Sequence, residues 1–440
     1  MSGLFAGIAL LATLSLEDAR GLAQRNIEVR VAAIRVQQAE EQRRVARSAV
    51  LPRVAVRAEI AAQWVGPQRY TSTFPTDAAG QRYERQSVDM PGFGQGVFSL
   101  GVGISQLLYD GGRFWNDISR TGALLEAEKG RLSEQRLAVM LETDRLYLDV
   151  WRVERTRDVL DRAVEHAKDQ RKRAEAQFEF GRAQRRDVID AELNHANDEL
   201  RRVRHDALMA NARSALAAWL LLPNDGFALA PLAAIPAPSA TAPHAPTPNL
   251  THLLAQARAR RPLLGALIRE REAAENQIVV SRSPLFPRIT AEVGYQRQGN
   301  TANPFFTDPA KQNSLQGGIV LTWNIFDGFG VSAAVAHAKL ELEQVKLETR
   351  RAELRIEMEI WQAFALHRAS TDAHRIAERS RVLAAEDLKL AEQRFDAGTG
   401  GTLEIRDAQV KWLEVELNAI DAEVDVRLAR STLVRVVGGE

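Results

Sequence analysis

The sequence contains no cysteine among its 440 residues. This absence excludes disulfides, thiolate metal sites, cysteine nucleophiles and a lipidated N-terminal cysteine. A charge surplus is also missing, because 58 Lys and Arg residues balance 57 Asp and Glu residues and leave a net charge of +1. Proteins that bind nucleic acid as their main partner usually carry a basic surplus, so no nucleic acid partner is expected.

A long hydrophobic run is missing as well. The longest apolar stretch has about a dozen residues, whereas a membrane-spanning helix needs roughly 20. A membrane role would therefore depend on strands or on a surface helix. Residues 2–14 are apolar enough for the core of a secretion signal, but the first basic residue is Arg20. We expect residues 1–15 to be the remnant of a signal; an ordinary helix start and a start site assigned too late are the alternatives.

Proline is absent from two long segments, residues 92–222 and 310–440. Because proline costs about 3 kcal/mol inside a helix, these segments are where long helices can form. Seven of the 16 prolines instead crowd residues 223–249, an Ala- and Pro-rich segment. This composition predicts an extended linker between two halves of the chain.

The two halves are repeats, which we assign to residues 16–222 and 250–440. An offset of 217 residues superimposes the following pairs without a gap: Asp110-Gly111 on Asp327-Gly328, Phe178 on Phe395, Gly181 on Gly398, and Asp190-Ala191 on Asp407-Ala408. Such a constant offset is hard to reach by chance. Each repeat is therefore expected to contain one helix, a strand–loop–strand unit, a long helix and a returning helix.

Alternating apolar and polar residues predict four strands, at about 53–66, 95–109, 288–299 and 313–326. The loops between them, about 66–95 and 299–313, are polar and rich in Gly, Pro, Thr and Asn. The alternation gives each strand one apolar face. A soluble β-sandwich would show the same pattern, so the strands alone do not identify a membrane protein.

Apolar residues that recur every seven positions predict long helices at about 113–180 and 330–397, with returning helices at about 185–222 and 402–437. A sustained heptad period imposes left-handed supercoiling. Each long helix would measure about 100 Å, which a compact globule of this size would not hold. The second heptad position is often polar, as at Arg157, Arg171, His367 and His374. This narrow seam suits the wall of a helical tube.

Four strands per chain are too few for a membrane barrel. If the apolar face meets lipid, every strand edge must be paired and the barrel must close. Two, three or four copies of the chain would supply 8, 12 or 16 strands. The residues therefore predict an oligomeric barrel on a long helical tube.

The order of short motifs resembles the TolC family of outer-membrane efflux proteins. The motifs are Leu51-Pro52-Arg53, Tyr109-Asp110-Gly111-Gly112, Phe326-Asp327-Gly328, Arg394-Phe395-Asp396-Ala397-Gly398 and Leu403-Glu404-Ile405-Arg406-Asp407-Ala408. The resemblance covers roughly residues 16–438. It implies a mainly α-helical chain with a transmembrane β-barrel contribution, and a trimer that forms a 12-stranded barrel on an α-helical tube.

The resemblance also implies a function. The protein would be the outer-membrane channel, or exit duct, of a tripartite efflux or type I secretion system in a Gram-negative bacterium. It would extend into the periplasm and work with a periplasmic adaptor and an inner-membrane transporter, without a cofactor. Many family members carry a lipidated N-terminal cysteine, so its absence here predicts that the barrel alone holds the protein in the membrane.

The resemblance places a gate near the periplasmic helix tips. Two acidic pairs lie just beyond the tips, Asp187 with Asp190 and Glu404 with Asp407, and a spacing of three puts each pair on one helix face. In the family, the positions of the second pair line the narrowest part of the closed channel. Three copies would stack the carboxylates in rings that attract cations and need basic partners. The nearby candidates for these partners are Arg185, Arg186 and Arg406.

The alternative is that these acids only stabilise helix N-termini, by about 0.3–1 kcal/mol each. The hairpin turns themselves predict adaptor docking, at Phe178 and Gly181 in the first repeat and at Arg394, Phe395 and Gly398 in the second. Here too the alternative is that these are only turn residues. The first turn, residues 181–187, is unusually basic, and the second, residues 398–402, lacks a basic residue.

Catalytic motifs are missing: the sequence has no GxxxxGK[ST] loop, HExxH pair or GxSxG elbow. We therefore do not expect an enzyme. We do not expect a metal site either, because His367 and His374 are two helical turns apart and too distant to share an ion without a partner chain. One function of another class stays open, a soluble coiled-coil structural or adaptor protein without a membrane barrel.

Overall fold

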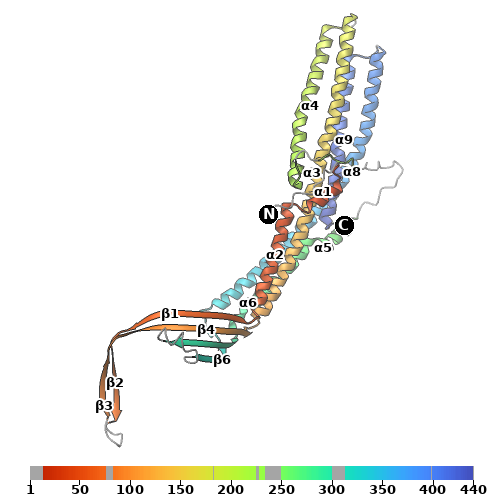
Figure 1. Cartoon of the computed structure of the whole chain (residues 1–440). Helices are drawn as coiled ribbons and strands as arrows, with labels where there is room; N and C mark the ends of the chain where they lie inside the picture. Colours follow the sequence, from red (N-terminus) through yellow and green to blue (C-terminus); the bar gives the residue numbers. More distant parts are fainter. Residues whose placement is uncertain are drawn as a thin grey trace. The chain divides into compact units, whose positions relative to one another are not determined.

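The computed structural model describes residues 13–75, 83–181, 183–223, 227–232, 249–299, 313–397 and 399–439. The chain divides into two compact units (Figure 1). The strand unit contains residues 40–123 and 271–344, and the helical unit contains residues 1–39, 124–270 and 345–440.

The strand unit contains an antiparallel sheet of four strands in the order β1-β4-β5-β6. Its strands are β1 (Arg53–Val65), β4 (Phe93–Tyr109), β5 (Arg288–Gly299) and β6 (Asn313–Thr322). The two repeats meet in the centre, where Val102 of β4 is paired with Tyr295 of β5. Strands β1 and β6 form the two edges of the sheet.

The segment expected to be a polar loop, about residues 66–95, contains two further strands, so this expectation was wrong. Strands β2 (Gln68–Pro75) and β3 (Tyr83–Met90) pair with each other as a separate antiparallel sheet. Thr and Tyr residues favour extended backbone, and the partner strand supplies the hydrogen bonds that a loop would lack. The second expected loop lies at residues 300–312, outside the described residues.

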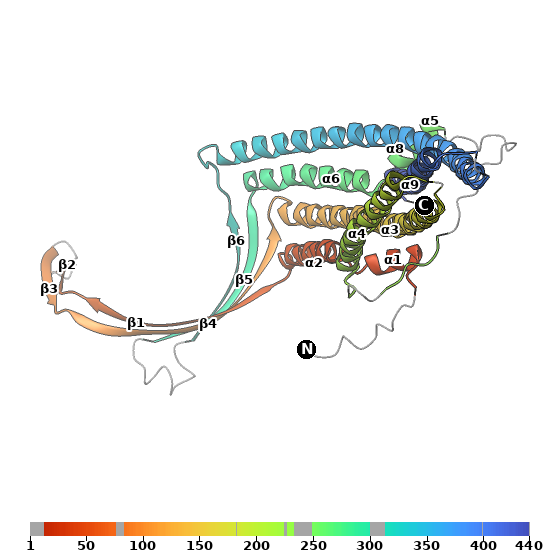
Figure 2. The same cartoon turned by 90° about the horizontal axis from the view of Figure 1, so that it is seen from above.

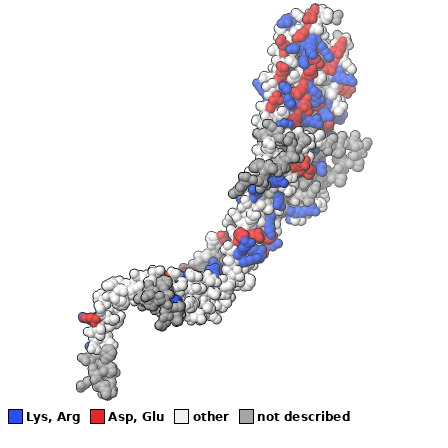
Figure 3. Space-filling view, in the orientation of Figure 1, with Lys and Arg blue, Asp and Glu red and all other residues white. Residues whose placement is uncertain are grey.

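The apolar face of the sheet is exposed. Val54, Val56, Ile60 and Trp64 share one face of β1, and all four are more than half exposed. Figure 3 shows few charged side chains over the sheet, whereas the helical unit carries many of both signs. A β-sandwich would bury this face against a second sheet. Within the described residues nothing covers it.

The Asp-Gly motifs of the two repeats start the long helices that follow the strands. The carboxylate of Asp110 accepts a hydrogen bond from the Phe114 amide at 3.1 Å, and that of Asp327 accepts one from the Val331 amide at 2.6 Å. These bonds satisfy amides that have no partner inside the helix. Gly111 has φ +71°, and a Cβ there would lie 2.6 Å from the carbonyl oxygen of Ser283. The repeated motif is therefore a structural feature of the turn.

Four long helices dominate the chain: α3 (Arg113–Glu179), α4 (Arg185–Leu220), α8 (Gly330–Asp396) and α9 (Thr402–Val437). Among the described residues, no helix has a stretch that is both long and apolar enough to cross a bilayer. The core of the helical unit lies between these helices. One buried cluster joins Trp151 of α3, Leu388 of α8 and Trp412 of α9.

Two helices, where one was expected, precede the strands in each repeat. They are α1 (Leu16–Ala23) and α2 (Ile27–Ser48), then α5 (Leu250–Arg260) and α6 (Pro262–Arg282), which is followed by a 3-10 turn (Ser283–Leu285). The second break follows from Pro262, because proline disfavours helical backbone in the preceding residue. At the first break, Asn26 accepts a hydrogen bond from the Glu28 amide at 2.8 Å and starts α2.

The N-terminal segment is bound to the helical unit by backbone and side-chain hydrogen bonds. Leu14 pairs with Leu229 as an isolated parallel bridge and is fully buried. The hydroxyl of Tyr147 donates to the carbonyl of Leu14 at 3.0 Å, and Arg20 of α1 contacts Asp144 of α3 at 2.7 Å. These contacts fix both the start of the described chain and part of the linker against α3.

Candidate gate and docking residues at the helix tips

The first tip is the turn between α3 and α4. Its amide at Gly181 donates to the carbonyl of Phe178 at 2.9 Å, and Gly181 has φ +69°. A positive φ suits glycine and ends the helix. The turn therefore accounts for the presence of a glycine at position 181.

Aromatic and cationic side chains crowd the first tip. The guanidinium of Arg185 lies 5.9 Å from the centre of the Phe178 ring, which is a cation–π geometry. The neighbouring Phe180 is 80% exposed. Sequence reasoning missed Phe180, because it lies outside the heptad positions that end at Phe178. The signal available in the sequence was an aromatic residue that lies outside the heptad positions and directly before the glycine that ends the helix.

The first acidic pair is engaged locally. The carboxylate of Asp187 accepts a hydrogen bond from the Gln184 amide at 2.8 Å, which caps α4. The carboxylate of Asp190 lies 3.7 Å from the guanidinium of Arg186, one turn away on the same helix. Asp187 thus caps the N-terminus of α4.

The second tip, between α8 and α9, is closed by an ion pair. Nη1 of Arg394 lies 2.5 Å from Oε1 of Glu404, and the carbonyl of Arg394 accepts hydrogen bonds from the amides of Thr399 and Gly400. Gly398 lies outside the described residues. Phe395 is only 7% exposed and packs with Ile405 in the core, so its ring offers no surface for docking.

The second acid of this pair also has a partner in its own chain. Oδ2 of Asp407 lies 2.5 Å from Nζ of Lys411. The hydrogen bond with Asp407 raises the pKa of Lys411 above its ordinary value. Glu404 and Asp407 are therefore each beside a cation, although neither cation is among the three arginines that the sequence suggested.

Arg406 instead connects the two hairpins. Its Nη1 lies 3.1 Å from Oδ2 of Asp198, a residue of α4 that is only 3% exposed. Arg406 is two residues from Glu404, and side chains two apart on a helix project from different faces. The structure thus separates Arg406 from the acids with which it was grouped and pairs it with a buried carboxylate that sequence reasoning missed.

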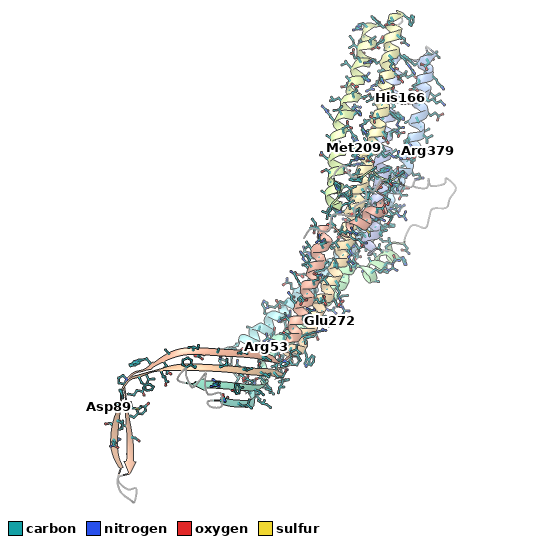
Figure 4. All side chains as sticks on the ribbon, in the orientation of Figure 1. Arg53, Asp89, His166, Met209, Glu272 and Arg379 are labelled. Atoms are coloured by element: carbon teal, nitrogen blue, oxygen red, sulfur yellow. The ribbon has the colours of Figure 1, made fainter. Side chains whose placement is uncertain are left out.

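Further contacts between polar side chains join the hairpins nearby. Nδ1 of His166 in α3 lies 3.5 Å from Oε1 of Glu392 in α8, and Nη1 of Arg173 lies 3.3 Å from Oδ1 of Asp396. Figure 4 labels His166 within this group of helices. Together with Arg406 and Asp198, these residues tie the first hairpin to the second near the tips.

In the described part of the chain, no three His, Asp or Glu side chains are grouped as for a metal ion. His367 lies in α8, and burial together with the charge of Arg430 lowers its pKa. His367 is half-buried, and His374, one heptad further along the helix, is buried. Both histidines thus occupy the packed face of α8.

A family model described as "Outer membrane efflux protein" matches residues 20–220 and 253–439. Among curated relatives, Protein CyaE of Bordetella pertussis is 25% identical over 190 residues, which cover 43% of this chain and 40% of that protein. The outer membrane efflux protein BepC of Brucella suis biovar 1 is 23% identical over 346 residues, 77% of this chain and 72% of that protein.

Solved structures show the same fold. The outer-membrane channel OprN is 19% identical with a TM-score of 0.76, and the match covers 97% of this chain and 90% of OprN. CusC is 17% identical with a TM-score of 0.78, covering 97% and 92%. The CmeC outer membrane channel of Campylobacter jejuni is 17% identical with a TM-score of 0.76, covering 96% and 85%. Since the family match extends over both repeats, the chain belongs to the outer membrane efflux protein family, the TolC-like channels of Gram-negative outer membranes, which are not enzymes.

Proposed function

We propose that this protein is the exit duct of a tripartite efflux or type I secretion system, and that it passively conducts substrates delivered by an inner-membrane transporter and a periplasmic adaptor. The observation that carries the proposal is the exposed apolar face of the four-stranded sheet in a chain of this family. Such a face is stable in lipid, but only when both edge strands are paired.

The edges β1 and β6 would pair between copies and close a barrel. Three copies supply twelve strands, the number that the resemblance implies. Mass measurement in detergent is expected to return a trimer, and a stable monomer or dimer would contradict it. The alternative is a soluble coiled-coil protein, which would be recovered from cells without detergent, whereas the channel must be extracted from the outer membrane with detergent.

The gate would lie at Glu404 and Asp407. In three copies these carboxylates would form two stacked rings that concentrate cations, with Arg394 and Lys411 as the neighbouring positive charges. Replacing both acids by Gln and Asn should reduce cation selectivity and the block by trivalent cations in bilayer recordings, with assembly unchanged. Unchanged recordings would show that the gate lies elsewhere.

The closed state would be held by ion pairs between the hairpins. Arg406 with Asp198 is the buried example, while Asp190 is paired locally with Arg186. Arg185 and Arg186 are exposed and would reach acids of a neighbouring copy. Replacing both by Gln should then raise closed-state conductance. An unchanged conductance would leave these two arginines as first-turn residues without a gating role.

The adaptor would dock at the two tips. Phe178 and Gly181 form the first docking region, and Arg394 with Gly398 forms the second. Replacing Arg394 and Gly398 should abolish efflux while the protein still assembles. The efflux measurement is growth of a deletion strain, with and without the variant gene, on a panel of metals, dyes and antibiotics. If efflux persists, docking occurs elsewhere.

A further inference from the structure

His166 of α3 lies where the two hairpins meet near their tips. In Figures 1 and 2, α3 and α4 run side by side as the first hairpin, and α8 and α9 run side by side as the second. Nδ1 of His166 lies 3.5 Å from Oε1 of Glu392 in α8. The imidazole ring also packs in a T-shaped arrangement on the indole ring of Trp412 in α9, with the ring centres 5.5 Å apart. His166 therefore contacts both helices of the second hairpin.

The carboxylate of Glu392 has no permanent cation beside it. In the described part of the chain, His166 is the one basic side chain within ion-pair distance of this carboxylate. Their separation of 3.5 Å exceeds the roughly 2.7–3.2 Å of an ordinary hydrogen bond, so a neutral His166 holds Glu392 only weakly. A charged imidazole would turn the same contact into an ion pair between the two hairpins.

A second carboxylate, that of Asp198 in α4, lines a small cavity together with His166. The cavity has a volume of about 10 Å³, which is room for about one water molecule, and Arg406 and Gln409 line it as well. Oδ1 of Asp198 is buried and accepts no hydrogen bond from the described residues. A proton on His166 would add a hydrogen-bond donor to this cavity, which could reach Asp198 directly or through one water molecule.

The remaining charged groups near His166 are already engaged with one another. They form the following contacts: Asp198 with Arg406 at 3.1 Å and with Arg201 at 3.6 Å, Arg162 with Glu416 at 3.9 Å, and, two turns nearer the tip, Arg173 with Asp396 at 3.3 Å. Glu392 is the carboxylate that these cations leave over. A protonated His166 would neutralise it and would also gain cation–π attraction from Trp412.

We infer that His166 is a pH-sensitive latch, which pairs with Glu392 when it is protonated and then holds the two hairpins together. Histidine changes its charge between about pH 5 and 8, so mild acid is the signal. The inference rests on the proposed function, in which the hairpins are in contact in the closed channel, and it adds a regulation of that gate. A proton that binds more tightly to the closed state than to the open state shifts the channel toward the closed state.

The effect of one latch is modest, because the side chains of His166 and Glu392 are 37% and 33% exposed. An ion pair of such exposure shifts an equilibrium by about two- to fivefold. Three latches that act together in the proposed trimer would shift it by about tenfold or more. A change of this size is measurable in single channels.

Single-channel recording in lipid bilayers at pH 7.5 and 5.5 tests the latch with the full-length protein. The measured quantity is the fraction of time for which the channel is open. For the wild type this open fraction should fall about tenfold from pH 7.5 to pH 5.5. His166→Gln cannot take up a proton and should keep its open fraction at pH 5.5. His166→Lys is charged at both pH values, so its open fraction should already be low at pH 7.5.

The matched control is His195→Gln in α4. Nδ1 of His195 lies 3.9 Å from Oε2 of Glu199, one turn further along the same helix, so this contact does not join the hairpins. The control should keep the wild-type response to acid. Glu392→Gln leaves every histidine in place and should nevertheless remove most of the response, because it removes the partner of the charged imidazole.

Three results would overturn the latch: an acid response of His166→Gln as large as that of the wild type, an equal loss of response in His195→Gln, or a wild-type open fraction that does not change with pH. Each of them leaves the proposed function standing, because the protein still forms a channel. A wild-type protein that forms no channel at either pH would contradict the proposed function together with the latch. The two failures are therefore distinguishable.

Discussion

The guanidinium of Arg406 in α9 reaches the buried carboxylate of Asp198 in α4, with Nη1 3.1 Å from Oδ2. The second carboxylate oxygen, Oδ1, lies 3.6 Å from Nη1 of Arg201. Arg406 is therefore the closer of two cations beside Asp198, and its contact joins residues 208 positions apart in the sequence.

Replacing Arg406 by Gln should destabilise the helical unit, because it leaves the buried carboxylate of Asp198 with only the more distant guanidinium of Arg201. We expect a loss of about 1–3 kcal/mol, below the value for a fully buried pair since Arg406 is partly exposed. Denaturant unfolding of the detergent-solubilised protein measures it. Asp198→Asn and the double variant complete a cycle, in which the two losses should not add. Strict additivity would show that the two side chains are not coupled.

Replacing Tyr147 by Phe should loosen the N-terminal segment, because the hydroxyl donates to the carbonyl of Leu14 at 3.0 Å. The expected loss is about 0.5–1.5 kcal/mol. Hydrogen exchange at residues 14–23 and 228–230 should accelerate. Exchange that rises equally at the distant second tip would argue for general destabilisation.

Tyr147→Phe should also change how the free energy of unfolding depends on pH in the alkaline range. Burial raises the pKa of Tyr147 from 10.0 to about 12, so the neutral hydroxyl is favoured in the folded chain. Its contribution is complete below pH 10 and is lost as the pH rises through about 12. Tyr147→Phe should lack this part of the decline. A parallel decline in both proteins would contradict it.

Replacing His367 by Val should reduce the loss of stability in acid. Burial and the charge of Arg430 lower the pKa of His367 below its ordinary 6.5, so the unfolded chain binds the proton more readily. The stabilising neutral form is complete above pH 6.5 and is lost as the pH falls below it. Valine is the matched choice, because the equivalent residue of the first repeat is the fully buried Val150. Thermal unfolding between pH 5 and 7.5 should give a flatter profile for the variant.

Phe180 and Phe395 should respond in opposite ways to substitution by Ala. Phe395 is buried, so its loss should cost about 3–5 kcal/mol by leaving a cavity. Phe180 is 80% exposed, and its loss should change stability by less than about 0.5 kcal/mol. Efflux should nevertheless fall in Phe180→Ala if the first tip docks an adaptor. Full efflux by a stable Phe180→Ala protein would exclude that residue from docking.

Much of the architecture could be predicted because its causes are local. Proline exclusion and the heptad period indicate helices over about 113–180 and 330–397, and the structure has them over Arg113–Glu179 and Gly330–Asp396. The repeated Asp-Gly motif marks the turns in which Asp110 and Asp327 cap those helices. The motif order also led to the family, which the family match confirms.

Other features could not be predicted, because they depend on partners far away in the sequence. The heptad position of Phe395 does not distinguish a docking residue from a core residue until Ile405 packs beside it. Strands β2 and β3 need each other, because each supplies the other's backbone hydrogen bonds.

The sequence by itself therefore determined the four long helices, the four strands of the main sheet and the family, since periodicity, proline and turn chemistry act over a few neighbouring residues. Only the tertiary structure decided which charged side chains meet. Arg406 lies beside two acids in the sequence, yet it pairs with Asp198 on another helix. The physical reason is that the rotation of a helix about its own axis, together with the position of the helix packed against it, determines which side chains come within reach of each other.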